Sequence, residues 1–352
     1  MVIVIGADVH KATHTFVAVD EVGRKLGEKT VKATTTGHEG ALRWARAQFG
    51  SDLTWGIEDC RHLSARLERD MLTAGQEVVR VPPKLMAHAR ASARERGKSD
   101  PIDALAVARA VLREPDLPAA AHDELTRELK LLVDRREDLV GERTRQINRL
   151  RWHLHELDPE LEVPIKGFKI TRQRRRVAAW LAGREGLVAE LAREILTDID
   201  VGSTRIDELE KRITVLVEDR YPHLLAVPGC GALTAAKIAG ETANVTRFRS
   251  EACFAMNAGV APLPVWSGNT RGRVRMSRTG NRQLNAALHR IAVTQIRLDG
   301  LGRTYYRKRL DSGDSTVEAL RCLKRRLARV VFHELHADQQ PTADPANLPL
   351  AA

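Results

Sequence analysis

Residues 1 to about 113 change repeatedly between the hydrophobic period of a strand and that of a helix. A run of β-branched side chains from Val2 leads to Asp8, and the stretch after it alternates polar and apolar residues, which is typical of half-buried strands. The predicted elements are, in chain order, strands at 2–8, 13–20 and 29–34, a helix at 37–49, a strand at 53–58, a helix at 63–72, a strand at 76–81 and a helix that begins near Ser99.

This order of elements predicts an α/β domain over residues 1–115. A turn at 21–24 joins two strands of an antiparallel meander, after which helices and strands alternate. We expect the side-chain oxygen of Ser99 to cap the last helix, and Pro101 suits its first turn. Three antiparallel strands followed by helix, strand, helix, strand and helix is the order of a ribonuclease-H-like fold, although other folds share pieces of it.

Leucine and isoleucine recur at spacings of three, four and seven over residues 123–157, which predicts a long amphipathic helix. Arg136 and Arg143 interrupt its apolar seam. A second helix of the same kind is predicted over 187–216. The two helices predict an assembly domain over residues 120–221, built either as an antiparallel coiled-coil hairpin or as the seam of a dimer.

A third, mainly helical unit is expected over residues 222–336. Residues 224–239 predict a helix-hairpin-helix element, in which Gly229 and Gly231 let backbone N–H groups at the second helix face a phosphate. The alternative is a tight connection between two packed helices. Residues 337–352 lack periodicity and aromatic side chains, so a disordered tail is predicted there.

The chain carries 57 Lys and Arg against 46 Asp and Glu, a formal charge of +11, which favours a polyanionic partner such as nucleic acid. Basic residues gather in an insertion at 158–186, in the loop before the final helices, and on the last helix. The predicted nucleic-acid contacts are Lys166, Lys169, Arg172, Arg174, Arg175, Arg271, Arg273, Arg275, Arg278 and Arg282. A further basic stripe on the last helix is formed by Arg321, Lys324, Arg325, Arg326 and Arg329. A solvated surface is the usual alternative for such runs.

The four cysteines stand far apart without the spacing of a zinc site, which indicates reduced thiols in a cytoplasmic protein. No apolar stretch approaches the length needed to span a membrane. We therefore expect a protein that acts on nucleic acid in the cytoplasm.

Four acidic residues are placed where they can converge beside the predicted sheet. Asp8 and Glu58 end two strands, and Asp100 and Asp103 lie three apart at a helix start, so both can face one way. Crowded carboxylates repel one another unless divalent cations bind them, and two magnesium ions can assist phosphodiester chemistry. Any one of these acids alone is better explained as a helix cap or a polar strand end, but all four in this order on this topology favour a metal site. His10 lies close enough in sequence to orient Asp8. The acids that could replace a member of this set are Asp20 and Asp59.

These residues carry a resemblance to a known family. The motifs are Gly6-Ala7-Asp8-Val9-His10-Lys11, Gly56-Ile57-Glu58, Lys98-Ser99-Asp100-Pro101-Ile102-Asp103-Ala104 and the glycine element at 224–239. With them the sequence resembles the DEDD transposases of bacterial insertion sequences, the insertion-sequence one-ten family, which includes Piv-type DNA invertases and bridge-RNA-guided recombinases. The resemblance extends over residues 1 to about 335.

The resemblance implies a RuvC-like domain whose magnesium-binding tetrad is Asp8, Glu58, Asp100 and Asp103. It also implies a C-terminal transposase domain with a nucleophilic serine in a Ser-Gly element, which here is Ser267. By the same resemblance the partners are double-stranded DNA at the element ends and target, a noncoding bridge RNA, and further copies of the chain as a dimer that assembles to a tetramer. The acids of one subunit would then face the serine of another.

Three alternatives stay open. Ser277 also lies among arginines and is the local alternative to Ser267 as nucleophile. A Piv-like invertase or RuvC-like junction nuclease would use the metal site without a guide RNA. A non-catalytic nucleic-acid-binding protein would show salt-sensitive binding without strand cleavage.

Overall fold

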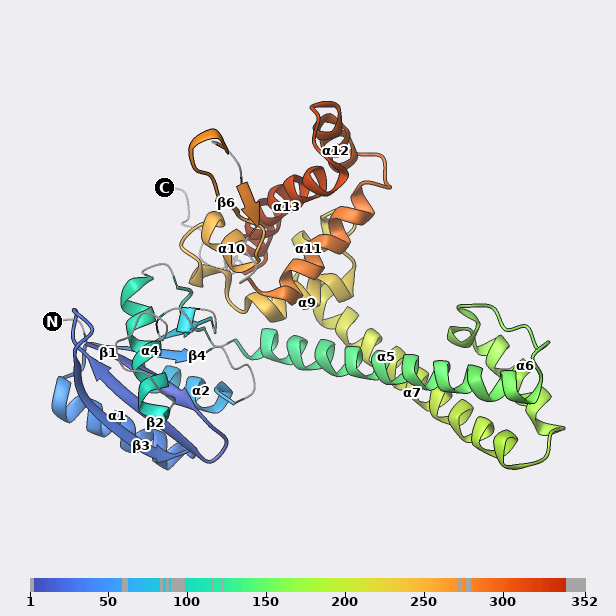
Figure 1. Ribbon diagram of the computed structural model, residues 1–352, viewed down its shortest axis with the longest axis horizontal. Helices are drawn as coiled ribbons and strands as arrows, with labels where there is room; N and C mark the ends of the chain where they lie inside the picture. Colours follow the sequence, from blue (N-terminus) through green and yellow to red (C-terminus); the bar gives the residue numbers. More distant parts are fainter. Residues whose placement is uncertain are drawn as a thin grey trace, which may run out of the picture. The chain divides into compact units, whose positions relative to one another are not determined.

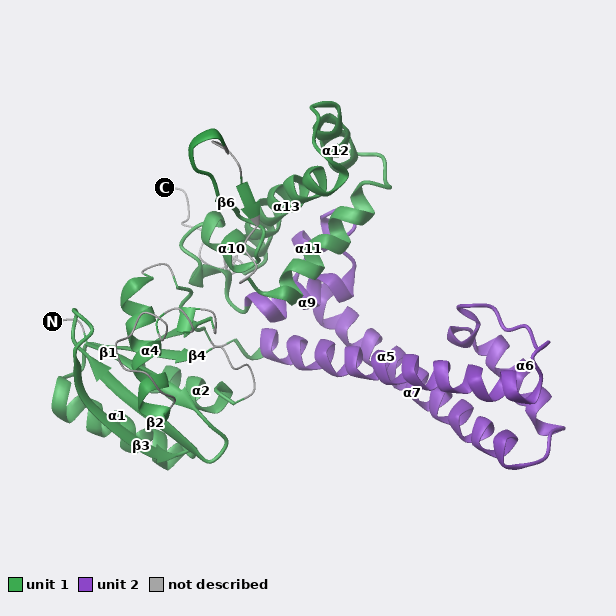
Figure 2. Cartoon of the chain, in the orientation of Figure 1, with its two compact units in different colours: residues 1–124, 243–352 green, residues 125–242 purple. Residues whose placement is uncertain are grey.

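The computed structural model describes residues 3–58, 63–82, 85–86, 89, 99–114, 117–121, 123–270, 274–276 and 280–339. The chain separates into two compact units (Figure 2). Unit 1 combines Met1–Glu124 with Ala243–Ala352, and unit 2 is Leu125–Thr242. Ser277, Arg271, Arg273 and Arg278 lie outside the described residues.

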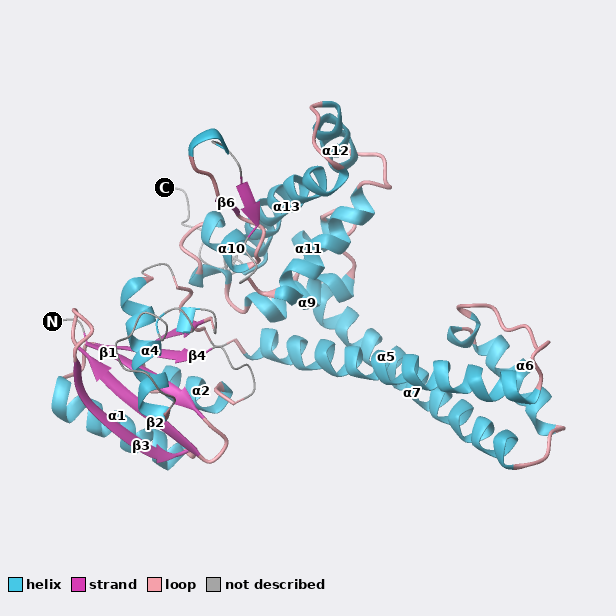
Figure 3. Ribbon diagram, viewed as in Figure 1, coloured by secondary structure: helices cyan, strands magenta, loops and turns pink. Residues whose placement is uncertain are grey.

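The N-terminal part of unit 1 is built on a mixed five-stranded sheet (Figure 3). The strands are β1 (Ile3–Val9), β2 (Thr13–Val19), β3 (Lys25–Lys32), β4 (Leu53–Glu58) and β5 (Glu77–Val81). Their order across the sheet is β3-β2-β1-β4-β5, with the first three antiparallel and β4 and β5 parallel to β1. This is the strand order of the predicted ribonuclease-H-like fold, and it confirms the mixed α/β class of the region.

Helices cover the two faces of this sheet. Helices α1 (Thr35–Phe49) and α2 (Ala65–Thr73) pack on one face, where the odd-numbered residues of β1 join Trp55 and Ile57 in the main apolar cluster. Helix α4 (Asp100–Arg113) packs on the other face against Val4 and Val17. Because strand side chains alternate between faces, the even-numbered residues of β1 and β4 point toward α4.

Two glycines let α4 approach the sheet closely. A Cβ on Gly6 would lie 2.1 Å from the carbonyl oxygen of Ala104, and one on Gly56 would lie 2.6 Å from Cγ2 of Val111. No side chain fits between strand and helix at these points. The glycines therefore set how closely α4 packs on β1 and β4.

Two predicted details of this region are corrected. The third strand begins at Lys25 and ends at Lys32, because it pairs with β2 directly after the turn that Asp20 closes by accepting from the amides of Val22 and Arg24. Ser99 occupies the N-cap position of α4 with extended backbone but makes no side-chain capping hydrogen bond. Pro101 does lie in the first turn, as predicted.

Unit 2 contains two long antiparallel helices, α5 (Glu124–Leu157, whose first residue belongs to unit 1) and α7 (Leu187–Arg220), as Figure 1 shows. Polar pairs join them along their length: Arg212 pairs with Glu128, Arg136 with Glu210, and Arg143 with Ser203. The arginines that interrupt the predicted apolar seam are thus satisfied across the helix pair.

The far end of this helix pair carries the short helices η1 (Gly167–Lys169) and α6 (Thr171–Ala182). They are held by an apolar cluster in which Leu150 and Leu154 of α5 meet Phe168, Val177 and residues of α7. Packing against α5 and α7 therefore orders the predicted basic insertion as a helix.

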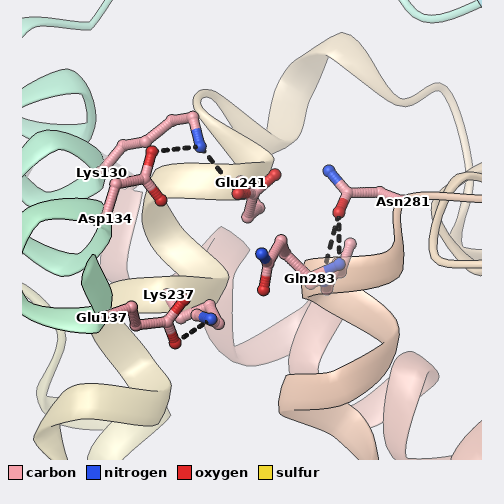
Figure 4. A network of polar contacts seen from close by, with 8 residues as sticks. Lys130, Asp134, Glu137, Lys237, Glu241, Asn281 and Gln283 are labelled. Atoms are coloured by element: carbon pink, nitrogen blue, oxygen red, sulfur yellow. Dashed lines mark hydrogen bonds and ion pairs between the residues drawn. The ribbon is translucent and has the colours of Figure 1, made fainter. Parts of the chain in front are cut away.

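Unit 2 continues beyond the long helices through α8 (Pro222–Ala226) and α9 (Ala232–Thr242). Two oppositely oriented ion pairs attach α9 to α5 (Figure 4): Lys130 contacts Glu241 at 2.8 Å, and Glu137 contacts the buried Lys237. A Cβ on Gly240 would lie 2.9 Å from Cα of Lys130, so the helices touch there without side chains between them.

The C-terminal part of unit 1 is mainly helical, as predicted. It contains η2 (Val245–Arg247), α10 (Glu251–Asn257), β6 (Pro262–Pro264), η3 (Gly268–Thr270), β7 (Val274–Met276), α11 (Arg282–Gln295), α12 (Leu301–Asp311) and α13 (Thr316–Gln339). Phe254 lies at its centre, with Phe248 and Phe332 against it.

The predicted start of a disordered tail at residue 337 is wrong. Helix α13 runs to Gln339, whose side chain accepts from the amide of Val245 at 2.7 Å and donates to the carbonyl of Ala243 at 2.9 Å. These bonds hold the last turn of the helix. Among the described helices, none is long and apolar enough to cross a membrane.

Candidate metal centre and serine hairpin

Asp8 is a carboxylate that the sheet buries. It lies in β1, the residue is 5% exposed, and its side chain points to the face covered by α4. The strand is formed by β-branched residues, and Gly6 leaves room for the helix beside it. A carboxylate in such a place requires a partner, because an unpaired buried charge is costly.

His10 and Asp100 complete a compact group with Asp8. Nε2 of His10 lies 2.9 Å from Oδ2 of Asp8 and 3.5 Å from Oδ1 of Asp100. Ligand atoms of all three residues lie within 4.8 Å of one another, which in the described part of the chain is the one group of three or more such side chains that could hold a metal ion. His10 thus makes the contact with Asp8 through which it was predicted to orient this carboxylate, and the orienting role stays a prediction.

The pKa of the Asp8 carboxyl is raised above its ordinary value. Burial is the largest influence on its pKa and raises it; His10 lowers it, and the charges of Asp103 and Asp100 raise it further, so that the pKa lies above its usual value. Repulsion between carboxylates of this kind is relieved when a cation binds among them.

The two remaining acids of the predicted tetrad lie on the elements that surround this group. Asp103 is buried on the first turn of α4, near enough to raise the pKa of Asp8. Glu58 is the last residue of β4, half-buried, and one position beyond the pair Ala7–Ile57 in the parallel ladder. Because Ile57 faces α1 and α2, Glu58 faces α4, as Asp8 does. Neither acid joins the close group of Asp8, His10 and Asp100.

Ser267 lies in a hairpin at the C-terminal part of unit 1. The hairpin is made by β6 and β7, which pair antiparallel with Leu263 opposite Arg275. Ser267 directly precedes η3 and is exposed, and its neighbour Trp266 is 51% exposed. Gly268 has a φ of +47°, a left-handed backbone that glycine adopts without strain. The serine therefore lies on the exposed connection between β6 and β7.

The base of the hairpin is closed by backbone contacts. A Cβ on Gly280 would lie 2.2 Å from the nitrogen of Gly259, so the two ends of the hairpin segment cross with no side chain between them. The amide of Asn281 donates to the carbonyl of Asn257 at 2.6 Å, while its side chain caps α11 by accepting from the amides of Gln283 and Leu284 (Figure 4).

A series of hydrogen bonds through Asn285 and Lys324 supports the base of the hairpin. The Asn285 amide nitrogen donates to the carbonyls of Ala258 at 2.9 Å and Gly259 at 3.1 Å, and its oxygen accepts from the ammonium of Lys324. Burial lowers the pKa of Lys324 to about 8, with Arg321 contributing. Sequence reasoning placed Lys324 in a surface stripe and missed Asn285. The signal for Lys324 was its helical spacing with the buried Ala328 and Val331.

The predicted nucleic-acid contacts include both buried and exposed residues. Arg174 does not belong among them: it is 6% exposed, and its guanidinium donates to Asp200, the carbonyl of Phe168 and the hydroxyl of Thr171. It holds α6 in place and has no surface to offer a phosphate. The described members that are exposed are Lys166, Lys169, Arg172, Arg175, Arg275 and Arg282.

The glycine element at residues 224–239 forms two helices joined by a tight turn, with Gly229 at a φ of +85°. Cys230 is buried between Gly229 and Gly231. The turn brings the chain directly into the first turn of α9. A role of its amides in phosphate binding stays a prediction.

Comparisons with known proteins agree with the sequence motifs. Residues 5–159 match the model of a transposase family with a DEDD domain, and residues 221–307 match the model described as transposase of the IS116/IS110/IS902 family. An uncharacterised protein of insertion element IS900 from Mycobacterium paratuberculosis is 27% identical, with 97% of this chain and 98% of the relative covered. Its counterpart in insertion element IS116 of Streptomyces clavuligerus is 27% identical over 93% of each chain.

A solved structure was also matched. Thermus thermophilus RuvC in complex with a Holliday junction substrate is 15% identical, with all of that chain and 34% of this one covered, at a TM-score of 0.28. The two family models cover the acidic sheet domain and the glycine and serine elements, and the relative from insertion element IS900 aligns across both segments. This chain belongs to the IS110/IS116/IS902 family of transposases.

Proposed function

We propose that the protein is a DNA recombinase that moves an insertion element by cutting DNA through a phosphoserine intermediate. The observation that carries the proposal is the group of Asp8, His10 and Asp100, in which a buried carboxylate with a raised pKa lies beside further acids. Structural roles rarely require such crowding, whereas phosphodiester chemistry does.

The residues present fit a hard divalent cation. Asp8, Glu58, Asp100 and Asp103 offer carboxylate oxygens from two strand ends and one helix start, the ligand type that Mg²⁺ prefers. Bound there as one or two ions, magnesium would supply Lewis-acid stabilisation of phosphate oxygens. His10 orients Asp8 through the hydrogen bond at 2.9 Å and compensates part of its charge.

Ser267 is the nucleophile of the proposed reaction. Its Oγ attacks the phosphorus of a DNA phosphodiester, a P–Oγ bond forms, and the bond from phosphorus to one deoxyribose oxygen breaks. The hydroxyl proton of the serine is released to a base, and the departing oxygen gains a proton. Attack by a strand hydroxyl on the phosphoserine reverses these steps and rejoins DNA, so that no external energy source is needed.

Exposed lysines and arginines provide the electrostatic contacts with nucleic-acid phosphates. Arg275 lies on β7 of the serine hairpin and Arg282 begins α11 close to the hairpin base. In unit 2, the exposed lysines and arginines of the 166–175 segment are a second set of cations that could contact nucleic acid. Pairing between a noncoding bridge RNA and both DNA partners would provide target choice, and assembly of four copies would bring the acids of one subunit to the serine of another.

Trapping a covalent adduct tests the proposal. Purified protein is incubated with nicked DNA of the element ends and Mg²⁺, quenched in denaturant, and separated on a gel that retains protein–DNA links. The wild type is expected to form an adduct that Ser267→Ala abolishes and Ser277→Ala retains. Asp8→Asn is expected to prevent strand cleavage with DNA binding unchanged.

Two results would overturn parts of the proposal. Cleavage without an adduct, or an adduct that survives Ser267→Ala, ends the serine assignment and indicates a metal-dependent junction nuclease or invertase. Salt-sensitive binding with no cleavage in Mg²⁺, unaltered by Asp8→Asn, indicates a non-catalytic nucleic-acid-binding protein.

A further inference from the structure

An exposed tryptophan lies on the outer face of α5, near the end of unit 2 that carries α6. Trp152 is 74% exposed although its neighbours Leu150 and Leu154 are buried in the apolar cluster that holds α6. Within the described part of the chain, no aromatic ring or cation is recorded against the indole. A large apolar ring left in water on an otherwise polar helix face is a feature that binding surfaces commonly have.

Two exposed arginines share the helix face of this ring, and further exposed cations lie at the same end of unit 2. Arg145 and Arg149 precede Trp152 by seven and three residues, so all three share one face of α5, and both arginines are exposed. The further exposed cations of this end are Lys166, Lys169, Arg172 and Arg175. No ion pair of these six with a carboxylate is recorded among the residues described for unit 2.

Helix α6 adds an electrostatic reason to expect an anion. It begins at Thr171 with Arg172 in its first turn, and no acidic residue lies in that turn. The N-terminus of a helix carries partial positive charge, so cations placed there repel it. An arrangement that costs stability in the free protein is relieved when a polyanion binds.

The neighbouring cavity does not compete for this role. It has a volume of about 580 Å³ and lies between the end of α5 and the 158–165 loop. Its two arginines are already occupied: Arg151 donates to the carbonyls of Val163, Pro164 and Ile165, and Arg176 donates to that of Glu162. For Arg145 and Arg149, by contrast, no such bond to a backbone carbonyl is found among the described residues.

We infer that the face of α5 that carries Trp152, Arg145 and Arg149 binds unpaired nucleotides by stacking a base on the indole, with the exposed cations of the 166–175 segment at the same end of unit 2 as further phosphate contacts. Duplex DNA or RNA hides its base faces, whereas single strands, loops and bulges expose them to an aromatic ring. The arginines and lysines neutralise the flanking phosphates. The inference deepens the nucleic-acid-binding part of the proposed function but does not depend on the serine chemistry.

The test compares single-stranded and duplex probes on the full chain. Fluorescence anisotropy is measured with labelled oligouridine and oligothymidine of about 16 nucleotides and with a duplex of the same length. Trp152→Ala is expected to weaken binding of both single strands by about 5- to 100-fold and to leave the duplex within about twofold. Trp152→Phe keeps a stacking ring and should restore most of the affinity.

Matched variants separate the contribution of base stacking to binding from the contributions of charge and of nonspecific hydrophobic contact. Arg149→Gln should weaken the binding of single strands and of duplex alike. It should also lower the slope of log affinity against log salt concentration by about one or slightly less. Leu187→Ser removes another apolar side chain, 67% exposed in unit 2, and should leave single-strand binding unchanged. Binding of the single strands should persist in Ser267→Ala, so failure of the serine assignment leaves this result intact.

Three outcomes would overturn the inference. Equal losses on duplex and single strand in Trp152→Ala would mean that the ring supports the fold or the charged surface only. Unchanged single-strand binding in that variant would mean that no base stacks there. A fall in the mass measured by sedimentation for Trp152→Ala, without a loss of single-strand affinity, would show that a second copy of the chain covers the tryptophan.

Discussion

The acid group and the serine hairpin are supported in opposite ways. Asp8 lies within a strand with two neighbouring strands hydrogen-bonded to it, and its position is fixed by backbone ladders and by Gly6. Ser267 stands on an exposed hairpin that is held at its base by Asn281 and Asn285. The first arrangement suits groups that must stay close despite repulsion. The second suits a nucleophile that has to reach a substrate bound elsewhere.

The largest expected effect tests whether these two halves complete one another between subunits. Alone, Ser267→Ala should lower adduct formation by about 10⁴-fold or more, as removal of a nucleophile does. Asp8→Asn should lower it by about 10³-fold, since a metal site contributes several kcal/mol. Mixed before DNA is added, the two proteins should recover a substantial part of the activity, measured as trapped adduct.

A control is needed for the effect that mixing with inactive subunits has by itself on the measured activity. The double variant, with both substitutions in one chain, is mixed with wild-type protein at the same ratio and should only dilute the activity. If the two single variants together remain as inactive as each alone, the acids and serine of one chain act together and the subunit-sharing proposal is wrong.

An intermediate effect is expected at the hairpin base. Asn285→Leu removes two bonds to backbone carbonyls and the acceptor for Lys324, which should lower the free energy of unfolding by about 3 kcal/mol at roughly 1 kcal/mol for each lost bond. Urea unfolding measures this change. The variant should also form less adduct because Ser267 is held less firmly.

Asn285→Leu should leave the acid group at β1 and α4 intact. Binding of Mn²⁺ at the acid group, followed by its paramagnetic effect on water relaxation, should match the wild type because β1 and α4 are untouched. Asn148→Leu, an exposed asparagine on α5, should change stability by less than about 0.5 kcal/mol. Equal losses from both asparagine variants would mean that Asn285 has no special role at the hairpin.

The difference between the two regions also explains what the sequence could predict. Strand period and the positions of Asp8 and Glu58 at strand ends were sufficient to place the sheet and bring both acids to the face of α4. Local repetition of apolar residues likewise predicted α5 and α7. These features depend on neighbours in the chain, which a single sequence displays directly.

The errors arise where a residue's role depends on a distant partner. Arg174 sits in a run of arginines, yet it shares the inward face of α6 with Val177 and Leu181, and its charge is met by Asp200 of α7. Its spacing with those apolar residues was a usable signal. Nothing local marks Asn285, because its function comes from carbonyls that precede it by more than twenty residues.

The smallest expected effect concerns the sheet face opposite the acids. His14 of β2 is buried, its ring stacks on that of His38 with centroids 5.1 Å apart, and His38 hydrogen-bonds Asp70 at 2.6 Å. Burial is the main cause that lowers the pKa of His14 to about 4, and the charge of His38 adds to it. The ring is therefore neutral in the folded protein over most of the working pH range.

Linkage fixes the direction of the pH effect. Above pH about 6.5 the ring is neutral in both states, and between that pH and about 4 only the unfolded chain takes up the proton, so folding weakens as the pH falls. With allowance for solvent screening the loss from pH 7 to pH 5 should be about 1 kcal/mol. His14→Phe removes the titrating group and should flatten this acid limb.

Hydrogen exchange measured peptide by peptide tests whether the effect of His14 stays within the sheet or also reaches the serine hairpin. After correction for intrinsic rates, peptides of β2 and α1 should lose protection between neutral and mildly acidic pH in the wild type but not in His14→Phe. Peptides of the serine hairpin should respond to the same pH change identically in both proteins. Parallel acid curves for wild type and variant in the sheet peptides would show that His14 does not carry the acid sensitivity. A hairpin that changes together with the sheet would show that the two halves are coupled rather than independently supported.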